Sequence, residues 1–600
     1  MKKSTQTPIV KAQIIYKVRD PISQTVSETL KEFSPFVREL LVVRGITDAI
    51  LAHAFIDPNY TLHTHDPFLL KDMQKVVDRI FESMRKKETI AIYSDYDADG
   101  IPGAVVLHDF FKKIGYENFV NYIPLRNEEG FGLNKNAIDD LCSQHAKLLI
   151  TIDCGITDVE HVAHANKCGI DVIITDHHIP SKKLPAAFAI INPKQKGDEY
   201  PEKMLCGSGV IFKVVQALVQ YAEKSDEFHF KVGGEKWMLD MVGLATLSDM
   251  VPLLGENRVF AYYGMTVLRK SPRVGLQRLF SLLKIDQRYV TEDDIAFMIT
   301  PRINAASRMG VPLDAFKLLS TTDEVEAGML AEHLNNKNDE RKGVVSSMVK
   351  EIKKKILERS LGNKKEKGEE MKQVIVIGNP EWKPSLLGLV ANSFSDEHNR
   401  PVFLWGRNSE VGDDEHMGTI LKGSCRAGGN TNVVALMEHA KDVFLEFGGH
   451  KGAGGFSVAF ENIHTLEEKL NIAYVELLNT QSEITDTLVD RKLSLEDVNW
   501  QTYSQVEKFA PFGFDNPKPL FLIENIRVDA KKLFGKEKNH LELKFKNASG
   551  KDVTAMAFFC TGEKFPVSVE MGSTINLVAT MEKSTFRNFP ELRLRIVDVF

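Results

Sequence analysis

The feature that most constrains the fold is a series of short β-branched segments that alternate with helical ones from Thr89 onward. The segments are TIAIYSD, LLITIDCG, DVIITDHH and FAIINP, and a helical stretch over Gly103–Ile114 follows the first of them. Such alternation is typical of a parallel α/β sheet. Ligands of open sheets bind beyond the carboxyl ends of the strands. We therefore expect the polar residues that end these segments to share one edge of the sheet.

Three carboxylates follow the first segment, because Asp95, Asp97 and Asp99 alternate with other residues in DYDADG. Carboxylates packed together repel one another and their pKa values rise, unless a divalent cation offsets the repulsion. The alternatives are an acidic turn and a calcium loop of the EF-hand type. The EF-hand needs a Glu at its twelfth position, where this chain has Val106. A bound metal ion is the simplest explanation.

The next two segments end in further possible ligands. Asp153 ends one, and Asp176, His177 and His178 end the other. Carboxylate with imidazole suits manganese better than calcium. A single Asp is usually a helix cap and adjacent histidines are often surface residues, but their recurrence at successive strand ends favours a metal site. Asp249, in the apolar run LATLSDMVPL, is either a cap, half of an ion pair or a further ligand.

These residue types fit the hydrolysis of phosphodiester bonds. A pair of metal ions roughly 3.5–4 Å apart can hold an attacking water and a leaving oxygen in line across a phosphate. Phosphate also needs hydrogen-bond donors, and glycines let backbone N–H groups approach it closely. The run FGGHKGAGGF is either a flexible turn or a binding loop, and we favour the loop. The candidate phosphate-binding residues are Arg302, Asn304, Ser424, Arg426, Gly448, Gly449 and His450.

The length of 600 residues exceeds what one hydrophobic core usually serves and predicts several domains. A charged run before residue 370 favours an exposed helix and loop over a nucleic-acid patch. The last hundred residues change to short strand-like runs, typical of a small β-barrel. The predicted parts are an N-terminal helical segment (1–85), an α/β catalytic domain (86–334), a connecting helix and linker (335–370), a smaller α/β domain (371–462), a helical connector (463–505) and a β-barrel (506–600).

The overall composition says more about the cellular compartment of the protein than about its function. The net charge of −6 excludes a generally cationic protein but neither supports nor excludes nucleic acid as a partner, because a local basic groove can hide in that average. The six cysteines include no C-x-x-C pair, which favours reduced thiols. The chain shows no apolar leader and no long apolar run. We expect a soluble, cytoplasmic protein.

The motifs SDYDADG, TIDCG and TDHH, in that order, resemble the successive motifs of the DHH phosphoesterases. LSDMVPL resembles the next acidic motif, and PRINAASRMG resembles the arginine-containing segment of RecJ-type proteins. GSCRA and FGGHKGAGGF are similar to the accessory DHHA1 domain, and APFGFDNPKPLF resembles the start of the oligonucleotide-binding (OB) fold of RecJ exonucleases. The resemblance covers nearly everything from Thr89 to the C-terminus.

The resemblance implies a parallel-sheet DHH domain, a connecting helix, a smaller α/β DHHA1 domain and an OB-like barrel. It implies two Mn²⁺ or Mg²⁺ ions, and catalysis that also uses His178. Arg302 and Asn304 would then bind phosphates. The candidates from Ser424 to His450 would bind the nucleic-acid strand near its end. The implied ligands are Asp95, Asp97, Asp99, Asp153, His177 and Asp249.

The implied activity is 5′-to-3′ degradation of single-stranded DNA in recombination and repair. A single-strand-binding protein or another repair protein is the expected partner, and a monomer the expected state. The chain departs from the family pattern at two places. The family commonly has His-Pro-Gly after a Trp, whereas here Lys383, Pro384 and Ser385 follow Trp382. Ala427 stands where a second Ser is usual. These changes bear on recognition of the strand end, because the acidic and histidine residues are all retained.

Three alternatives are weaker. A DHH phosphodiesterase for cyclic dinucleotides or very short oligonucleotides does not account for the length and the terminal β domain. A non-catalytic replication scaffold related to RecJ would have lost ligands that this chain keeps. An editing domain of the alanyl-synthetase type shares only the accessory domain and cannot account for DYDADG and DHH.

Overall fold

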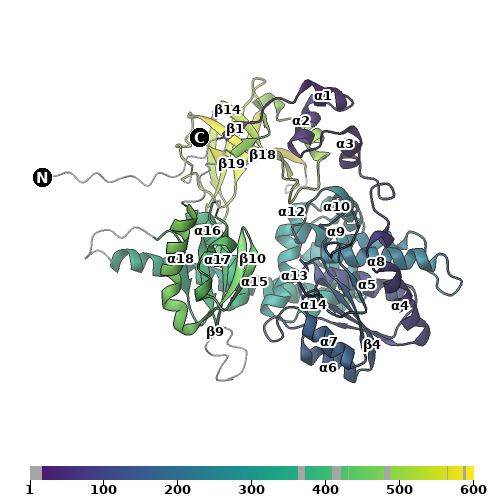
Figure 1. The fold of residues 1–600 in the computed structure, drawn as a ribbon. Helices are drawn as coiled ribbons and strands as arrows, with labels where there is room; N and C mark the ends of the chain where they lie inside the picture. Colours follow the sequence, from purple (N-terminus) through teal and green to yellow (C-terminus); the bar gives the residue numbers. More distant parts are fainter. Residues whose placement is uncertain are drawn as a thin grey trace. The chain divides into compact units, whose positions relative to one another are not determined.

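The computed structural model describes residues 16–362, 372–407, 420–429, 431–478, 487–563, 565–584 and 589–600 (Figure 1). The chain divides into two compact units. The first, which we call the barrel unit, groups Met1–His65, Met250–Tyr263 and Ile484–Phe600. The second, the α/β unit, groups Asp66–Asp249 and Gly264–Glu483.

The first sheet of the α/β unit has five parallel strands in the order β3-β2-β4-β5-β6. The central strands are buried, which matches their nearly continuous apolar sequences. One face packs against α6 and α7, through side chains such as Tyr93, Leu149 and Ile174. The strands are β2 (Thr89–Ser94), β3 (Phe119–Tyr122), β4 (Ala146–Ile152), β5 (Asp171–Thr175) and β6 (Ala189–Ile191).

Helices connect and extend this sheet. The predicted helix at Gly103–Ile114 is α5, which begins earlier, at Gly100. The predicted linker helix is part of α15, which begins before residue 335, and residues 363–371 lie outside the described residues. The helices are α4 (Met73–Lys86), α5 (Gly100–Lys113), α6 (Lys135–Ser143), α7 (Val159–Lys167), α8 (Gly207–Ala222), α9 (Leu239–Ser248), α11 (Val274–Leu282), α12 (Glu292–Asp294), α13 (Thr300–Met309), α14 (Pro312–Ser320) and α15 (Glu324–Gly362).

A second, mixed sheet of the α/β unit has the order β10-β11-β9-β8-β7. Its helix α16 packs on one apolar face through Leu386 and Val390, and α17 and α18 pack on the other. The elements are β7 (Ile375–Gly378), α16 (Pro384–His398), β8 (Val402–Gly406), β9 (Ile420–Arg426), α17 (Val433–His439), β10 (Glu446–His450), β11 (Ala453–Ala459) and α18 (Ile463–Leu478).

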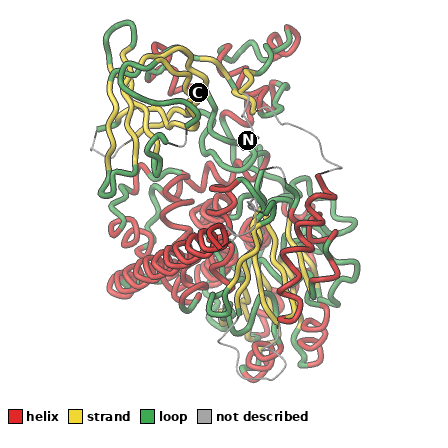
Figure 2. Tube along the Cα trace, turned by 90° about the vertical axis from the view of Figure 1, so that its left-hand side faces the viewer, coloured by secondary structure: helices red, strands yellow, loops and turns green. Residues whose placement is uncertain are grey.

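The barrel unit contains a seven-stranded sheet in the order β13-β14-β18-β19-β17-β16-β15. Figure 2 shows these strands in yellow, curling beside the C-terminus. Alternate residues of the strands fill one core, as the burial of Leu541, Leu543 and Phe545 on β16 shows. The strands are β13 (Arg491–Lys492), β14 (Phe521–Arg527), β15 (Ala530–Phe534), β16 (His540–Lys546), β17 (Asp552–Ala557), β18 (Thr574–Ser584) and β19 (Glu591–Val599).

The remaining elements of the barrel unit come mainly from the N-terminal part of the chain. β1 pairs in parallel with β12, which lies inside the segment that we predicted as a helical connector. Residues 479–486 of that connector lie outside the described residues. The elements are β1 (Tyr16–Val18), α1 (Gln24–Thr29), α2 (Pro35–Val43), α3 (Ala49–Ile56), the start of α10 (Gly255–Leu268), β12 (Thr487–Val489) and α19 (Trp500–Glu507).

Short 3-10 turns and one π turn link these elements. The π turn covers Ile295–Ile299 and leads directly into α13. The 3-10 turns are at Pro67–Leu69, Gly234–Met238, Gln287–Tyr289, Lys441–Val443, Phe460–Asn462 and Leu495–Asp497.

Two segments group differently from the domain boundaries that we predicted. Residues 1–85 were expected as one helical segment, yet the structure assigns Met1–His65 to the barrel unit and α4 to the α/β unit. The physical reason is burial: Phe36 of α2 stacks on Phe521 with ring centroids 6.0 Å apart. The start of α10 groups with the barrel because the buried Arg258 donates to the carbonyl oxygens of Phe55, at 2.6 Å, and Phe509, at 3.0 Å.

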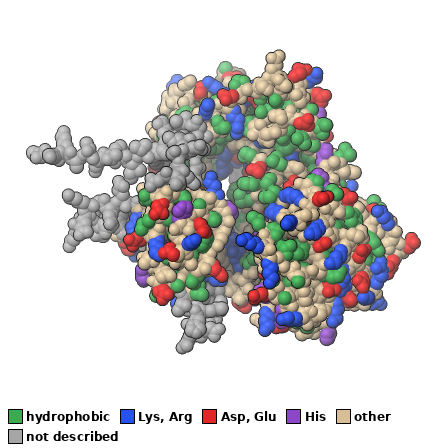
Figure 3. Space-filling model, in the orientation of Figure 1, with side chains coloured by type: hydrophobic (Ala, Val, Ile, Leu, Met, Phe, Trp, Pro, Cys, Tyr) green, Lys and Arg blue, Asp and Glu red, His purple; other side chains and the backbone are tan. Residues whose placement is uncertain are grey.

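The surface is mixed in charge. On the face drawn in Figure 3, Lys and Arg side chains are interspersed with Asp and Glu, in keeping with the small net charge. Within the part of the chain that the structure describes, no helix combines the length and the apolar character that a membrane crossing requires.

Candidate metal centre

Five of the six candidate metal ligands follow three neighbouring strands, β2, β4 and β5, whose carboxyl ends lie at one edge of the first sheet, and the sixth, Asp249, follows α9. Backbone hydrogen bonds between neighbouring segments continue past the ends of the strands and keep the first residues of the following loops side by side. The amide of Asp95 donates to the carbonyl of Ile152 at 3.1 Å, and the amide of Asp153 donates to that of Thr175 at 2.9 Å. The parallel sheet thus brings residues that are far apart in sequence to one place.

All six predicted metal ligands converge there, in two adjoining groups of three. Ligand atoms of the first group, Asp95, Asp97 and Asp153, lie within 4.8 Å of one another, and so do those of the second group. Nε2 of His177 is 3.1 Å from Oδ1 of Asp153, which joins the groups. The second group is Asp99, His177 and Asp249.

The start of α8 holds Asp99 in position. The carboxylate of Asp99 accepts hydrogen bonds from the amides of Gly207, at 2.6 Å, and Ser208, at 2.7 Å. The positive end of a helix dipole favours a carboxylate there. Oδ1 of Asp97 accepts from the amide of Asp99 at 2.7 Å, so the acidic loop is also braced from within.

Crowding and burial raise the pKa values of the carboxyl groups. Burial, with the charge of Asp97 added, raises the pKa of Asp95 well above its usual range. Burial and the charge of Asp99 do the same to the pKa of Asp153, and they raise that of Asp249 to about 9. Burial and the charge of Asp97 raise the pKa of Asp99 to about 6. The chain alone therefore lacks the positive charge that this cluster needs.

The buried oxygen atoms and the types of ligand at this site fit divalent metal ions. Oδ1 of Asp95 and Oδ1 of Asp153 are buried and accept no hydrogen bond from the described residues, since the 3.1 Å contact between Asp153 and His177 lacks hydrogen-bond geometry. A buried polar atom without a partner is costly, and a bound cation removes that cost. The oxygen ligands with one imidazole suit manganese or magnesium.

Asp176 is a further candidate that our site assignment left out, although it belongs to the Asp-His-His triplet. Its Oδ1 accepts from the amide of His177 at 2.7 Å and lies 2.8 Å from Nδ1 of His178. Burial alone would raise the pKa of Asp176, but the hydrogen bond and charge of His178 lower it. Burial opposes protonation of His178, yet Asp176 raises the pKa of that histidine. Asp176 thus orients His178.

His177 differs from its neighbour. Burial and the charge of His178 lower the pKa of His177 to about 3. A neutral imidazole is the form that binds a metal ion. The two adjacent histidines therefore have different roles: His177 suits a ligand, and His178 suits a group that carries a proton.

The two candidates on α13 make different contacts. Oδ1 of Asn304 accepts from the amide of Ala98 at 3.0 Å, so Asn304 supports the acidic loop directly. Arg302 is buried and donates to Oδ1 of Asn335 and to the carbonyl of Met298, the latter at 2.6 Å. These contacts are structural ones within the helices, and phosphate binding by Arg302 stays a prediction.

The candidates of the second sheet are brought together on three neighbouring strands. Arg426 of β9 pairs with Ala453 of β11, which pairs with His450 of β10. Paired residues and those two positions along a strand share a face, so Ser424 and Gly448 lie on the same face. Gly449 lies on the other face and has φ +142°, where an added Cβ would be 2.3 Å from the carbonyl oxygen of Ala453.

A group of arginines near Asp97 escaped the sequence analysis. Burial and the nearby charges of Arg126 and Arg341 lower the pKa of Arg308 to about 10, and Arg426 adds to the effect. Nε of Arg308 and Nε of Arg341 are buried without a hydrogen-bond partner among the described residues. Neighbouring guanidinium groups repel one another because each carries a positive charge. A bound phosphate would offset this repulsion and accept hydrogen bonds from the Nε atoms.

The barrel carries a cluster of aromatic and basic side chains. The guanidinium of Arg595 lies 4.1 Å from the centroid of the Phe558 ring, and His540 packs against Phe559 with centroids 4.8 Å apart. The Phe559 side chain is 76% exposed. An exposed aromatic ring in a cluster that also contains basic side chains is an arrangement on which nucleic-acid bases can stack.

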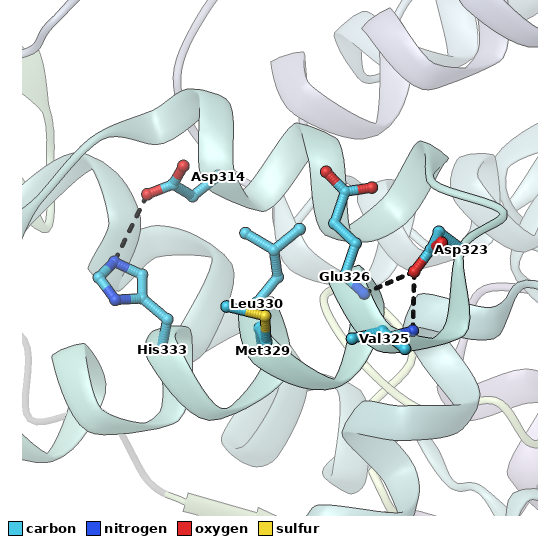
Figure 4. Close-up of a pocket in the computed structure, with 7 residues that line it drawn as sticks. All are labelled: Asp314, Asp323, Val325, Glu326, Met329, Leu330 and His333. Carbon is cyan, nitrogen blue, oxygen red and sulfur yellow. Dashed lines mark hydrogen bonds and ion pairs between the residues drawn. The ribbon is translucent and has the colours of Figure 1, made fainter.

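A hollow of about 680 Å³ lies on α14 and α15 and is a separate feature (Figure 4). Nε2 of His333 is 3.4 Å from Oδ2 of Asp314, and Asp323 accepts from the amides of Val325 and Glu326. None of the candidate metal ligands lines it, so we do not place the active site there. The lining residues are Asp314, Asp323, Val325, Glu326, Met329, Leu330 and His333.

Comparison with known proteins agrees with this geometry. Residues 89–246 match the DHH family, N-terminal domain, and residues 489–598 match the RecJ OB domain. Across 98% of this chain and 80% of the other, the fold is similar to that of RecJ from Thermus thermophilus in complex with Mn²⁺, with a TM-score of 0.77 and 23% identity. A crystal structure of exonuclease RecJ bound to manganese matches 70% of this chain and 96% of its own, at 28% identity and a TM-score of 0.55.

Similarity in sequence extends over most of the chain. The single-stranded-DNA-specific exonuclease RecJ of Escherichia coli is 28% identical over 499 residues, 82% of this chain and 83% of that protein. The RecJ protein of Bacillus subtilis is 34% identical over 571 residues, 94% of this chain and 68% of that protein. With the metal-binding geometry and the two domain matches, this similarity shows that the chain belongs to the RecJ family of the DHH phosphoesterases.

Proposed function

We propose that this chain is a divalent-metal-dependent exonuclease that hydrolyses the phosphodiester bonds of single-stranded DNA from 5′ to 3′, in recombination and repair. The observation that carries the proposal is the contact between His177 and Asp153, which joins two groups of three possible ligands. Two adjoining groups suit a pair of ions, which supply an acidified water and stabilise charge on the phosphate when bound. The similar proteins of the RecJ family support the choice of substrate.

Each ligand has a proposed place. Asp95 and Asp97 with Asp153 would hold one Mn²⁺ or Mg²⁺ ion, and the second group of three would hold the other. His178, whose pKa is raised beside Asp176, favours its protonated form and suits donation to a phosphate oxygen. Burial of Asp95, Asp99, Asp153 and His177 strengthens the electrostatic interactions within the cluster.

The strand itself needs a longer binding surface. Arg308 and its neighbouring arginines would bind phosphates beside the metal centre. The shared face of Ser424, Arg426, Gly448 and His450, with Asn304 and Arg302 on α13, would bind the strand near its end. The exposed Phe559 on the barrel would stack on a base of single-stranded DNA.

Further parts of the proposal rest on the family resemblance. The proposed setting is the cytoplasm, with a monomeric chain and a single-strand-binding protein or another repair protein as partner. Gel filtration with light scattering tests the monomer directly. The predicted domain boundaries, 86–334 and 371–462 above all, are proposed as the DHH and DHHA1 domains and are testable by limited proteolysis.

The experiment that tests the function uses a single-stranded DNA oligonucleotide labelled at either end. Intact chain with Mn²⁺ is compared with Asp153→Ala, and a blunt duplex is the control. Progressive loss from the 5′ end that the substitution abolishes is the expected result. Cleavage of a dinucleotide without digestion of the oligonucleotide would instead indicate a small-substrate phosphodiesterase.

A further inference from the structure

A second cluster of possible metal ligands lies on α6 and α7, which run side by side over one face of the first sheet (Figure 1). Asp139 and Cys142 are on α6, His164 is on α7, and Cys168 follows the last residue of α7. Spacings of three and four residues put each pair on one face of its helix. Both helices end just before β4 and β5 begin, so the cluster lies at the opposite edge of the sheet from the candidate metal centre.

Asp139, His164 and Cys168 converge closely, and Cys142 lies beside them. Nε2 of His164 is 2.6 Å from Oδ1 of Asp139 and 3.9 Å from Sγ of Cys168. Ligand atoms of these three residues all lie within 4.8 Å of one another. Sγ of Cys142 is 3.8 Å from the carbonyl oxygen of Cys168. Burial, and then a hydrogen-bond interaction with the Cys142 thiol, raise the pKa of the Cys168 thiol, so the two thiols are also neighbours.

We propose that Asp139, Cys142, His164 and Cys168 form a tetrahedral Zn²⁺ site that fastens α6 to α7. Zinc bonds of about 2.0–2.3 Å to oxygen, nitrogen and sulfur place neighbouring ligand atoms about 3.3–3.8 Å apart in a tetrahedron. The His164 distances of 2.6 and 3.9 Å lie on either side of that range, and the Cys142 thiol would turn from the carbonyl of Cys168 to supply the fourth ligand. Thiolate ligands select zinc over manganese and magnesium.

Two further features favour a cation at this position. The carboxyl ends of both helices carry the negative ends of their dipoles. All four side chains are partly accessible, from the exposed Asp139 to the half-buried thiols, so an ion can enter from solvent. An ion pair between the helices would account for Asp139 and His164 alone. It would not account for two thiols that reach the same place from different helices.

The first test is the zinc content of the full chain, purified without chelators. The background is Asp153→Ala, because this variant weakens metal binding at the candidate metal centre. We expect one zinc ion per chain by mass spectrometry, lost in the Cys142→Ser/Cys168→Ser double variant. Cys560→Ser is the matched control, since this half-buried thiol lies in the barrel unit, and it should keep the zinc. Equal zinc content in the double variant would overturn the proposal.

Cobalt gives a direct signature of thiol ligation. Co²⁺ added to the zinc-free protein should produce an intense near-ultraviolet thiolate-to-metal absorption, which the carboxylates and imidazole of the candidate metal centre cannot give. Absence of that band, or a Cys142–Cys168 disulfide in protein that takes up no zinc, would sink the idea.

Two measurements cover the case in which the double variant does not fold. Asp139→Asn changes a single exposed ligand and should weaken zinc binding by about tenfold or more. X-ray absorption at the zinc edge of the unaltered chain should show two sulfur ligands. A shell of only oxygen and nitrogen would contradict the site. Neither readout depends on nuclease activity, so both are independent of the proposed function.

Discussion

Gly207 lies directly against Asp153, because a methyl group on Gly207 would be 2.5 Å from Cβ of Asp153 and 2.6 Å from its Oδ1. Side-chain carbons do not approach one another so closely, and something must shift. The amide of Gly207 also donates to Asp99 at 2.6 Å. One small residue therefore keeps two of the candidate ligands in position.

We predict that Gly207→Ala displaces Asp153 and lowers Mn²⁺-dependent digestion of single-stranded DNA by about 100-fold, as expected for a misplacement of about 1 Å in an active site. Steady-state rates measure the effect. Gly209→Ala is the control, since its methyl group would make an ordinary contact, 3.5 Å from Leu205, and it should keep full activity. A fully active Gly207→Ala would refute the assigned position of Asp153.

Asp176 should matter through His178. Asp176→Asn removes the negative charge 2.8 Å from Nδ1 of His178, so we predict that the pKa of His178 falls and that activity drops by about 10- to 100-fold. An NMR titration of His178 measures the first effect and nuclease assays the second. Asp286→Asn changes an exposed acid that pairs with Arg288 and should leave both unchanged. An unchanged pKa for His178 would show that Asp176 does not orient it.

The proposed metal centre could be assembled from sequence because five of its six predicted ligands follow strands, whereas Asp249 follows helix α9. The pattern of strand and acid at Asp97, Asp153 and His177 is local, and parallel strands turn local patterns into one site. The same reasoning missed the arginines. Arg126 lies in a loop after β3 and Arg341 lies in the middle of α15, and no periodicity relates them.

The fold, too, has parts that could be predicted from sequence and parts that could not. The parallel sheet followed from its alternating segments, whereas the grouping of the N-terminal part with the barrel did not. β1 has three residues and pairs with β12, near the other end of the chain. So short a strand carries no pattern, and its partner is chosen by tertiary packing. The stacking of Phe36 on Phe521 is equally invisible in a linear pattern.

Arg308 should bind substrate rather than support the fold. We predict that Arg308→Ala lowers kcat/KM on single-stranded DNA by about 10- to 100-fold, the range expected for losing a hydrogen bond to a charged group. The dependence of log Kd on log salt should also fall by about one phosphate contact. Arg278→Ala, which removes an exposed partner of Glu324, is the control. Reduced stability with unchanged kcat/KM would assign Arg308 a structural role.

The metal-free chain should lose stability as the pH rises. Burial and the charge of Asp99 raise the pKa of Asp249 to about 9 in the folded state, whereas an unfolded Asp titrates near about 3.9. Between these values the folded state keeps a proton that the unfolded state has released, so the free energy of unfolding falls with increasing pH. Thermal unfolding in EDTA across this range should show that slope.

Asp249→Asn carries no titrating proton and should flatten the slope. Saturating Mn²⁺ should reverse it, because deprotonation of the ligands favours metal binding. Asp294→Asn changes a partly exposed, helix-capping acid and should behave like the unaltered chain in EDTA. If Asp249→Asn and the unaltered chain show the same pH slope without metal, Asp249 is not the buried acid that we describe.

Phe559 tests whether the barrel holds DNA by stacking. Its ring is 76% exposed, and the cation of Arg595 lies over the adjacent Phe558. Phe559→Ala should weaken binding of single-stranded DNA by about 1–3 kcal/mol, the cost of losing one stacked base. Fluorescence anisotropy in the inactive Asp153→Ala background measures affinity without digestion. Phe460→Ala, in the second sheet's domain and 47% exposed, should bind normally. Because stacking does not depend on charge, the loss should persist at high salt; a loss that vanished there would indicate an electrostatic role instead.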